Sequence, residues 1–134
     1  MVGLVIATHG RLAEELVATA EQIVGKLART ATCLVEPGAS PEEIRGRVGD
    51  AVRSVEDGSG VIVLADLFGG TPCNECLLIR DHALEVVTGV NLPMLLKASS
   101  LRSTPMPLAE LAAALAQHGQ RNITNASALM REPA

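Results

Sequence analysis

The chain alternates between short runs of β-branched residues and longer stretches with helical spacing, and this alternation restricts the fold more than any other feature. Strands are predicted over Val2–Thr8, Thr30–Val35, Val61–Ala65 and Leu84–Thr88. Their nearly continuous apolar residues are typical of strands that are covered on both faces. The pattern therefore predicts an α/β fold with a doubly wound, mainly parallel sheet and helices on both faces. We expect one domain over residues 1–134.

Helices are predicted between these strands. Apolar residues at helical spacing between residues 11 and 27 predict one buried stripe, made of Leu12, Leu16, Ala20, Ile23 and Leu27. Ser40, Pro41 and Glu43 predict a helix start with a capping box. Further helices are expected over Pro72–Asp81, from about Pro93, and from the Pro105/Pro107 region to Gly119, followed by a short fifth strand near Ile123.

Composition excludes several classes of function. The 11 basic and 15 acidic residues give a net charge of −4, which argues against a grip on nucleic acid phosphates. One Phe, with no Tyr or Trp, cannot build a base-stacking platform. No apolar run approaches the roughly 20 residues that span a bilayer. Three cysteines, an odd number, fit a reducing compartment better than a disulfide scaffold, so we expect a cytoplasmic protein.

The predicted strand order 2-1-3-4 places two chemically useful residues at one point. Parallel sheets bind ligands beyond the carboxyl ends of their strands, where the strand order reverses, here between the first and third strands. His9 follows the first strand, and Asp66 follows the third. If Asp66 accepts a hydrogen bond from one ring nitrogen of His9, the other nitrogen becomes a positioned nucleophile. The alternative is a surface histidine that only helps to end a strand.

The loop from Asp66 to Pro72 adds a candidate anion site. Gly69 and Gly70 allow main-chain N–H groups to approach a ligand closely, and Thr71 adds a hydroxyl at the start of a helix. An ordinary strand-to-helix turn is the alternative. Together with His9 and Asp66, the loop favours phosphoryl transfer through a histidine. No nucleotide-binding glycine motif and no Mg²⁺ cluster is recognisable, so we predict neither a cofactor nor a metal.

Cys73 and Cys76 form a C-x-x-C pair at a predicted helix start, which is the layout of a thiol–disulfide enzyme. Two cysteines three positions apart on a buried helix face are also simply a small apolar pair. A zinc site would need two further ligands. The thiol–disulfide function is therefore kept as an alternative.

Several motifs in order resemble the mannose-family EIIA domain of the bacterial phosphoenolpyruvate-dependent sugar phosphotransferase system (PTS). They lie within residues 2–97. The first of these motifs is Thr8-His9-Gly10, and the next is Pro37-Gly38 after the second predicted strand. Residues 66–74 read D-L-F-G-G-T-P-C-N, similar to the family signature D-x-[FW]-G-G-[ST]-P-x-N, and residues 89–95 read G-V-N-L-P-M-L.

The resemblance implies a phosphocarrier. His9 would accept a phosphoryl group on Nε2 from the carrier HPr, with Asp66 bonded to Nδ1, and pass it to a mannose-type IIB domain that serves membrane IIC and IID components. It also implies a homodimer in which an antiparallel fifth strand crosses to the partner's sheet. Two related alternatives are a regulatory protein read through the phosphorylation state of His9 and the phosphotransfer subunit of the dihydroxyacetone kinase system.

Overall fold

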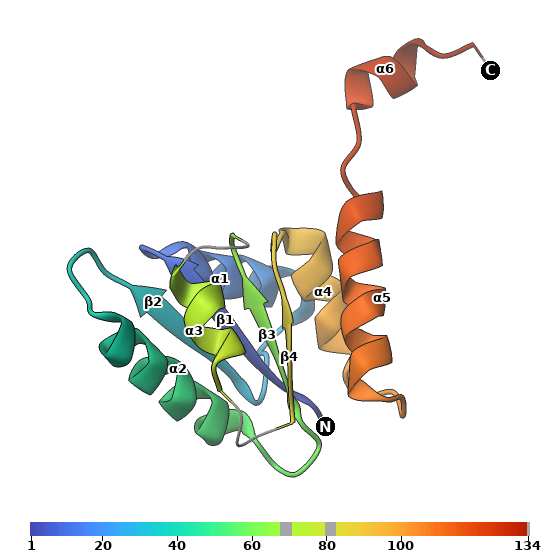
Figure 1. Ribbon diagram of the computed structural model, residues 1–134. Helices are drawn as coiled ribbons and strands as arrows, with labels where there is room; N and C mark the ends of the chain where they lie inside the picture. Colours follow the sequence, from blue (N-terminus) through green and yellow to red (C-terminus); the bar gives the residue numbers. More distant parts are fainter. Residues whose placement is uncertain (68–70, 80–82, 134) are drawn as a thin grey trace.

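A four-stranded parallel sheet forms the centre of the molecule, with strands in the order β2-β1-β3-β4 (Figure 1). The strands are β1 (Gly3–His9), β2 (Thr30–Val35), β3 (Val61–Ala65) and β4 (Leu84–Val87). The structure is a computed structural model, and it describes residues 1–67, 71–79 and 83–133. The predicted fold class and strand order are confirmed. β1 extends one residue beyond the prediction, so that His9 is its last residue.

Helices cover both faces of the sheet. Helices α1 (Leu12–Val24), α4 (Leu92–Leu101) and α5 (Leu108–Arg121) pack on one face, and α2 (Pro41–Val55) and α3 (Thr71–Leu77) pack on the other (Figure 1). Each face has its own apolar core. The doubly wound arrangement leaves the ends of the strands as the sites where loops and polar side chains gather.

The central strands supply both cores because successive side chains point to opposite faces. Leu4 and Ile6 of β1 join the core beneath α1, α4 and α5, whereas Val5 and Ala7 join the core beneath α2 and α3. Every residue of β3 is fully buried. Burying one Leu, Ile or Val side chain contributes about 1.5–3 kcal/mol. The continuous apolar runs in the sequence thus reflect burial on both sides.

One helix start, one helix face and one helix end test the sequence-based predictions. The Ser40 side chain accepts a hydrogen bond from the Glu43 N–H at 3.1 Å, as the capping-box pattern predicts. The predicted stripe is confirmed at Ala20 and Leu27, which are buried, and at Leu16, which is partly buried, but it is wrong at Leu12 and Ile23, which are 46% and 58% exposed. Ala13, which is buried, and Val17, which is partly buried, complete the packed face of α1. The helix also ends before Leu27, since Gly25 turns the chain with φ +86°.

The second half of the chain differs from the prediction at its boundaries. α3 ends at Leu77 rather than at Asp81, and α5 continues through Gly119 to Arg121. Beyond α5 the chain forms an arm of residues 122–133, which carries the short helix α6 (Ala126–Arg131) and stands away from the sheet (Figure 1). The strand expected near Ile123 is not a strand in this single chain. Pairing of the arm with a second copy stays a prediction.

Candidate functional site

His9 lies at the carboxyl end of β1, the strand that is flanked by β2 and β3. The chain after β1 leads to α1 on one face of the sheet, and the chain after β3 leads to α3 on the other face. Ligands bind at such a point in parallel sheets. Gly10 follows with φ +55°, a left-handed conformation that glycine adopts without steric cost. The Gly10 N–H donates to the Val35 carbonyl at 3.0 Å. The turn therefore holds His9 at the edge of the sheet, with its side chain 47% exposed.

Asp66 follows β3 and contacts His9 directly. Its Oδ2 accepts one hydrogen bond from the His9 main-chain N–H at 3.0 Å and lies 2.9 Å from His9 Nδ1. Its Oδ1 accepts from the Leu67 N–H at 3.0 Å. The Asp66 side chain is only 14% exposed. The structure thus brings together the two residues that the strand order predicts, and it adds a main-chain bond that the sequence did not indicate.

This contact determines the chemistry available to the imidazole ring. Partial burial acts to raise the pKa of Asp66, but the hydrogen bonds from the His9 ring and the His9 N–H, together with the His9 charge, outweigh it and hold the pKa below its usual value. Asp66 is therefore ionised near neutral pH and can only accept hydrogen bonds. Nδ1 of His9 must carry the proton, so Nε2 holds the lone pair. A neutral ring in this tautomer is a positioned nucleophile.

The predicted phosphate-binding residues are only partly described. Gly69 and Gly70 lie outside the described residues. Thr71 is the first residue of α3, so a helix begins five residues after Asp66. The roles of His9, Asp66, Gly69, Gly70 and Thr71 stay predictions.

The cysteine pair lies in the core. Cys73 and Cys76 are 1% and 0% exposed, and both are free thiols. Burial raises the pKa of Cys76 to about 12, with the neighbouring Cys33 and Cys73 acting in the same direction. A redox-active cysteine needs an accessible thiol with a lowered pKa. These features favour the small apolar pair over the thiol–disulfide enzyme.

An ion pair fastens the cysteine-bearing helix α3 to α2. Glu75, which is 6% exposed, accepts a hydrogen bond from Arg45 Nε at 3.0 Å, and Arg45 Nη2 lies 2.8 Å from the same carboxylate oxygen. Among the described residues, no group of three or more His, Cys, Asp or Glu side chains is arranged to hold a metal ion. Glu75 is therefore held by the Arg45 guanidinium.

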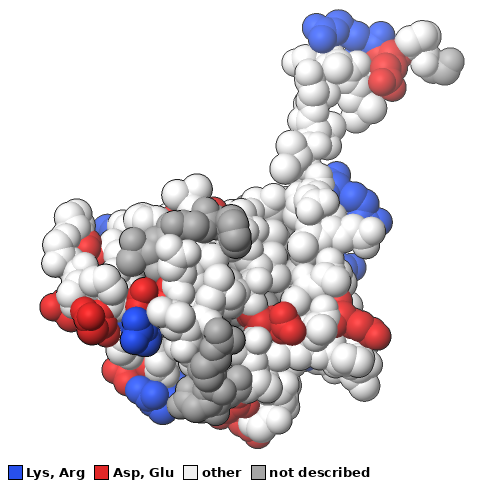
Figure 2. Space-filling view, in the orientation of Figure 1, with Lys and Arg blue, Asp and Glu red and all other residues white. Residues whose placement is uncertain are grey.

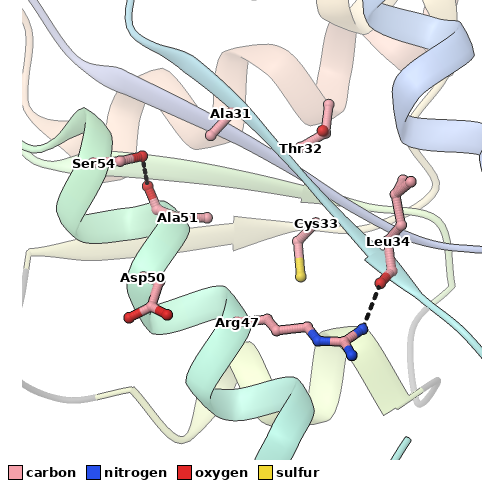
Figure 3. Close-up of a pocket in the computed structure, with 8 residues that line it drawn as sticks. All are labelled: Ala31, Thr32, Cys33, Leu34, Arg47, Asp50, Ala51 and Ser54. Atoms are coloured by element: carbon pink, nitrogen blue, oxygen red, sulfur yellow. Dashed lines mark hydrogen bonds between the residues drawn. The ribbon is translucent and has the colours of Figure 1, made fainter.

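An open groove of about 400 Å³ lies between β2 and α2 and includes neither His9 nor Asp66 (Figure 3). Arg47 reaches across it and donates to the Leu34 carbonyl at 3.4 Å, while the Cys33 thiol points toward it (Figure 3). Burial raises the pKa of the Cys33 thiol, and the nearby Arg47 lowers it only in part. The charged groups that line the groove are Arg47 and Asp50, beside a thiol whose pKa is raised, and we assign it no catalytic role.

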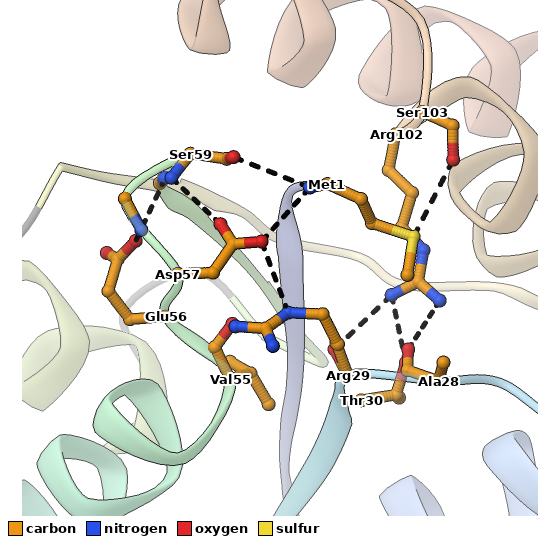
Figure 4. Close-up of polar contacts among 12 residues, drawn as sticks. Met1, Ala28, Arg29, Thr30, Val55, Glu56, Asp57, Ser59, Arg102 and Ser103 are labelled. Carbon is orange, nitrogen blue, oxygen red and sulfur yellow. Dashed lines mark hydrogen bonds and ion pairs between the residues drawn. The ribbon is translucent and has the colours of Figure 1, made fainter.

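A polar network lies at the end of the sheet opposite His9 (Figure 4). Arg102, 4% exposed, donates to the carbonyls of Ala28 and Arg29. Arg29 donates to the Val55 carbonyl at 2.6 Å and pairs with Asp57. Hydrogen bonds from Ser59 and from the N-terminal amine lower the pKa of Asp57 to about 2. Because the arginines bind main-chain carbonyls from several turns, we interpret this network as structural.

The surface carries mixed charge. Figure 2 shows basic and acidic side chains interspersed over this face of the molecule, without one large basic patch. This agrees with the net charge of −4. Within the described part of the chain, no helix combines the length and apolar character that crossing a membrane requires.

Comparisons with known proteins identify the family of this chain. A family model described as the fructose IIA component of the PTS matches residues 3–122. The mannose-specific EIIAB component of Escherichia coli K12 is 29% identical over 124 residues, which is 91% of this chain. The chain spans 38% of the length of that protein.

Two solved structures share the architecture over nearly the whole chain. One is a mannose/sorbose-specific IIA subunit from Enterococcus faecalis, with 34% identity and a TM-score of 0.82, covering 92% of this chain and 93% of that one. The other is a PTS IIA protein associated with the fucose utilization operon of Streptococcus pneumoniae, with 30% identity and a TM-score of 0.83. It covers 98% of this chain and 100% of that one.

Proposed function

Because the chain belongs to the mannose/fructose IIA family of the PTS, we propose that it is a phosphocarrier that accepts a phosphoryl group on His9. The donor is phospho-HPr, and the acceptor is a mannose-type IIB domain. The observation that carries the proposal is the 2.9 Å contact between His9 Nδ1 and Asp66 Oδ2. It leaves Nε2 as the nucleophile on a half-exposed ring.

The transfer step follows from this geometry. The Nε2 lone pair of His9 attacks the phosphorus atom, a new N–P bond forms, and the N–P bond to the donor histidine breaks. The donor imidazole leaves with that electron pair. Nδ1 keeps its proton, so the His9 ring gains positive charge as the bond forms, and the Asp66 carboxylate stabilises that charge. The main-chain N–H groups of Gly69, Gly70 and Thr71 would bind the phosphoryl oxygens. Transfer to the IIB domain reverses these roles.

The experiment is mass spectrometry after incubation with phosphoenolpyruvate, enzyme I and HPr. We expect one phosphoryl group that is acid-labile and alkali-stable, as a phosphohistidine should be. His9→Ala should abolish it, whereas His118→Gln, which changes a histidine near the end of α5, should leave it intact. Labelling that persists in His9→Ala would refute the assignment. Adding a IIB domain then separates transport from a regulatory role, because only a transport component must pass the group onward.

We also propose a cytoplasmic homodimer in which the arm of residues 122–133 contacts a second copy. Ile123, Leu129 and Met130 on this arm are 78%, 58% and 83% exposed. Exposed apolar groups of this size favour association. Sedimentation of the full chain should show a dimer, and truncation after Asn122 should give a monomer that still accepts phosphate on His9. A full chain that sediments as a monomer would refute the dimer alone.

A further inference from the structure

The start of helix α1 is held in an unusual way. Arg11 occupies the N-cap position but makes no side-chain capping hydrogen bond. The cap comes instead from inside the sheet, because the Ala13 N–H donates to Thr8 Oγ1 at 2.7 Å. Both Thr8 and Ala13 are 0% exposed, so water cannot replace this bond. A buried main-chain N–H without a partner is strongly disfavoured.

Thr8 is itself fixed by the sheet. It lies in β1 opposite Leu34 of β2, one residue before His9. Its hydroxyl therefore connects a rigid strand to the first turn of α1 across the short turn that contains His9. The turn has three such attachments in sequence. The His9 N–H binds Asp66, the Gly10 N–H binds the Val35 carbonyl, and the Ala13 N–H binds Thr8.

The His9 side chain depends on these attachments because, within the described part of the chain, Nδ1 is the one ring atom with a hydrogen-bond partner. Nδ1 contacts Asp66, and the ring is 47% exposed. The position of Nε2 therefore follows the position of the His9 main chain. Group transfer requires placement within about 0.5 Å, and a shift of about 1 Å can cost a hundredfold in rate.

We propose that Thr8 is a positioning residue for phosphoryl transfer, acting through His9 by capping α1 from within β1. This inference rests on the proposed function of His9. Without the Thr8 oxygen, the buried Ala13 N–H must move to find another acceptor, and the first turn of α1 moves with it. The turn of residues 9–12 lies between the two anchors, so the His9 ring samples other orientations and the Nδ1–Asp66 bond weakens.

Three substitutions, compared with wild type, isolate the hydroxyl oxygen. Thr8→Val has nearly the shape of wild type but lacks the hydroxyl oxygen. Thr8→Ala is close in size to Thr8→Ser, and of these two only Ser can accept the hydrogen bond from the Ala13 N–H. We expect Val and Ala to slow single-turnover phosphorylation by phospho-HPr about tenfold or more. Thr8→Ser should stay within about threefold of wild type. The donor concentration for half-maximal rate should be unchanged in all variants, because the donor meets the exposed surface and not buried Thr8.

A second readout does not require the partner proteins. ¹⁵N NMR of the unphosphorylated histidine ring should show Nδ1 protonated in wild type and Thr8→Ser, with loss of that preference in Val and Ala. Folded Val and Ala variants with wild-type rates and ring signals would overturn the proposal. It would also be overturned if both failed to fold while Ser folded, since Thr8 would then act only on stability. Failure of wild type to accept phosphate would instead refute the proposed function.

Discussion

Asp66→Asn is the substitution that separates the charge of Asp66 from its shape. The carboxylate accepts from the His9 ring, the His9 N–H and the Leu67 N–H, so alanine would remove all three bonds at once. Asparagine keeps one carbonyl oxygen in nearly the same volume but loses the negative charge. Its amide group can also donate to Nδ1, which would place the ring proton on Nε2 and remove the nucleophilic lone pair.

The expected size of the effect follows from the distance between the charges. During transfer the ring becomes cationic 2.9 Å from Asp66 Oδ2. At an effective dielectric constant of about 20, Coulomb's law gives an attraction of about 6 kcal/mol. The ring is 47% exposed, so solvent screening reduces this to about half, or about 3 kcal/mol. Since each 1.4 kcal/mol or so is a factor of ten, transfer should slow by about a hundredfold.

The assay is single-turnover transfer from phospho-HPr, followed by the amount of phosphorylated protein over time. Asp50→Asn is the matched control, because Asp50 is an exposed carboxylate on α2 that pairs with Arg53 and contacts nothing at His9. We expect Asp50→Asn to transfer at the wild-type rate. Circular dichroism and urea unfolding should show that Asp66→Asn is folded at the assay temperature.

A folded Asp66→Asn protein with a rate within about threefold of wild type would refute the electrostatic argument, because less than 1 kcal/mol would then come from the carboxylate charge. Equal slowing in Asp50→Asn would show that net charge, rather than the contact with His9, controls the encounter with the donor.

Three further predictions concern stability and thiol reactivity. In urea titrations, Gly3→Ala should lower the free energy of unfolding by about 1–3 kcal/mol, because a Cβ there would lie 2.5 Å from the Val55 carbonyl oxygen. Gly46→Ala, which has open space around the new Cβ, should instead raise the free energy of unfolding by about 0.5–1 kcal/mol. Cys76, with a pKa raised to about 12, should resist maleimide at pH 8 in the native protein and react only after unfolding, as mass spectrometry would show. The pKa of Asp66 in the folded protein lies below the unfolded value of about 3.9. The Asp66 carboxylate therefore contributes to stability above about pH 4, and this contribution is lost as the pH falls through the folded pKa. In acid titrations, the stability advantage of wild type over Asp66→Asn should accordingly shrink below about pH 4.

The sheet could be predicted from the sequence because its information is local. The strands are short runs rich in β-branched and aliphatic residues, continuous in β3, and α2 begins at a capping box whose hydrogen bond forms as expected. The predicted strand order makes the carboxyl ends of the first and third strands neighbours, and this places His9 next to Asp66. No packing detail was needed for that step, since the order of the strands alone decides which strand ends are neighbours.

What the sequence could not supply depends on tertiary packing. The predicted stripe of α1 is wrong at Leu12 and Ile23, because the packed face of the helix runs through Ala13 and Ala20 and leaves those two residues exposed. A hydrophobicity pattern records which residues are apolar but not how closely a helix approaches its neighbour. The strand expected near Ile123 also depends on tertiary pairing. In this single chain the segment near Ile123 is not part of the sheet, and its pairing with a second copy stays a prediction.

The double use of Asp66 Oδ2 explains why site and fold are difficult to separate in this protein. The same oxygen accepts from the His9 main chain and from the His9 ring, so the carboxylate fixes both where the imidazole is attached and how it is turned. A sequence motif can indicate a histidine–carboxylate pair but not this shared oxygen. It follows that a substitution that merely weakens the ring contact should also loosen the turn. In Asp66→Asn, the rate of phosphoryl transfer and the fraction of His9 rings protonated on Nδ1 should therefore fall together. The same should hold in Thr8→Val, which leaves Asp66 unchanged.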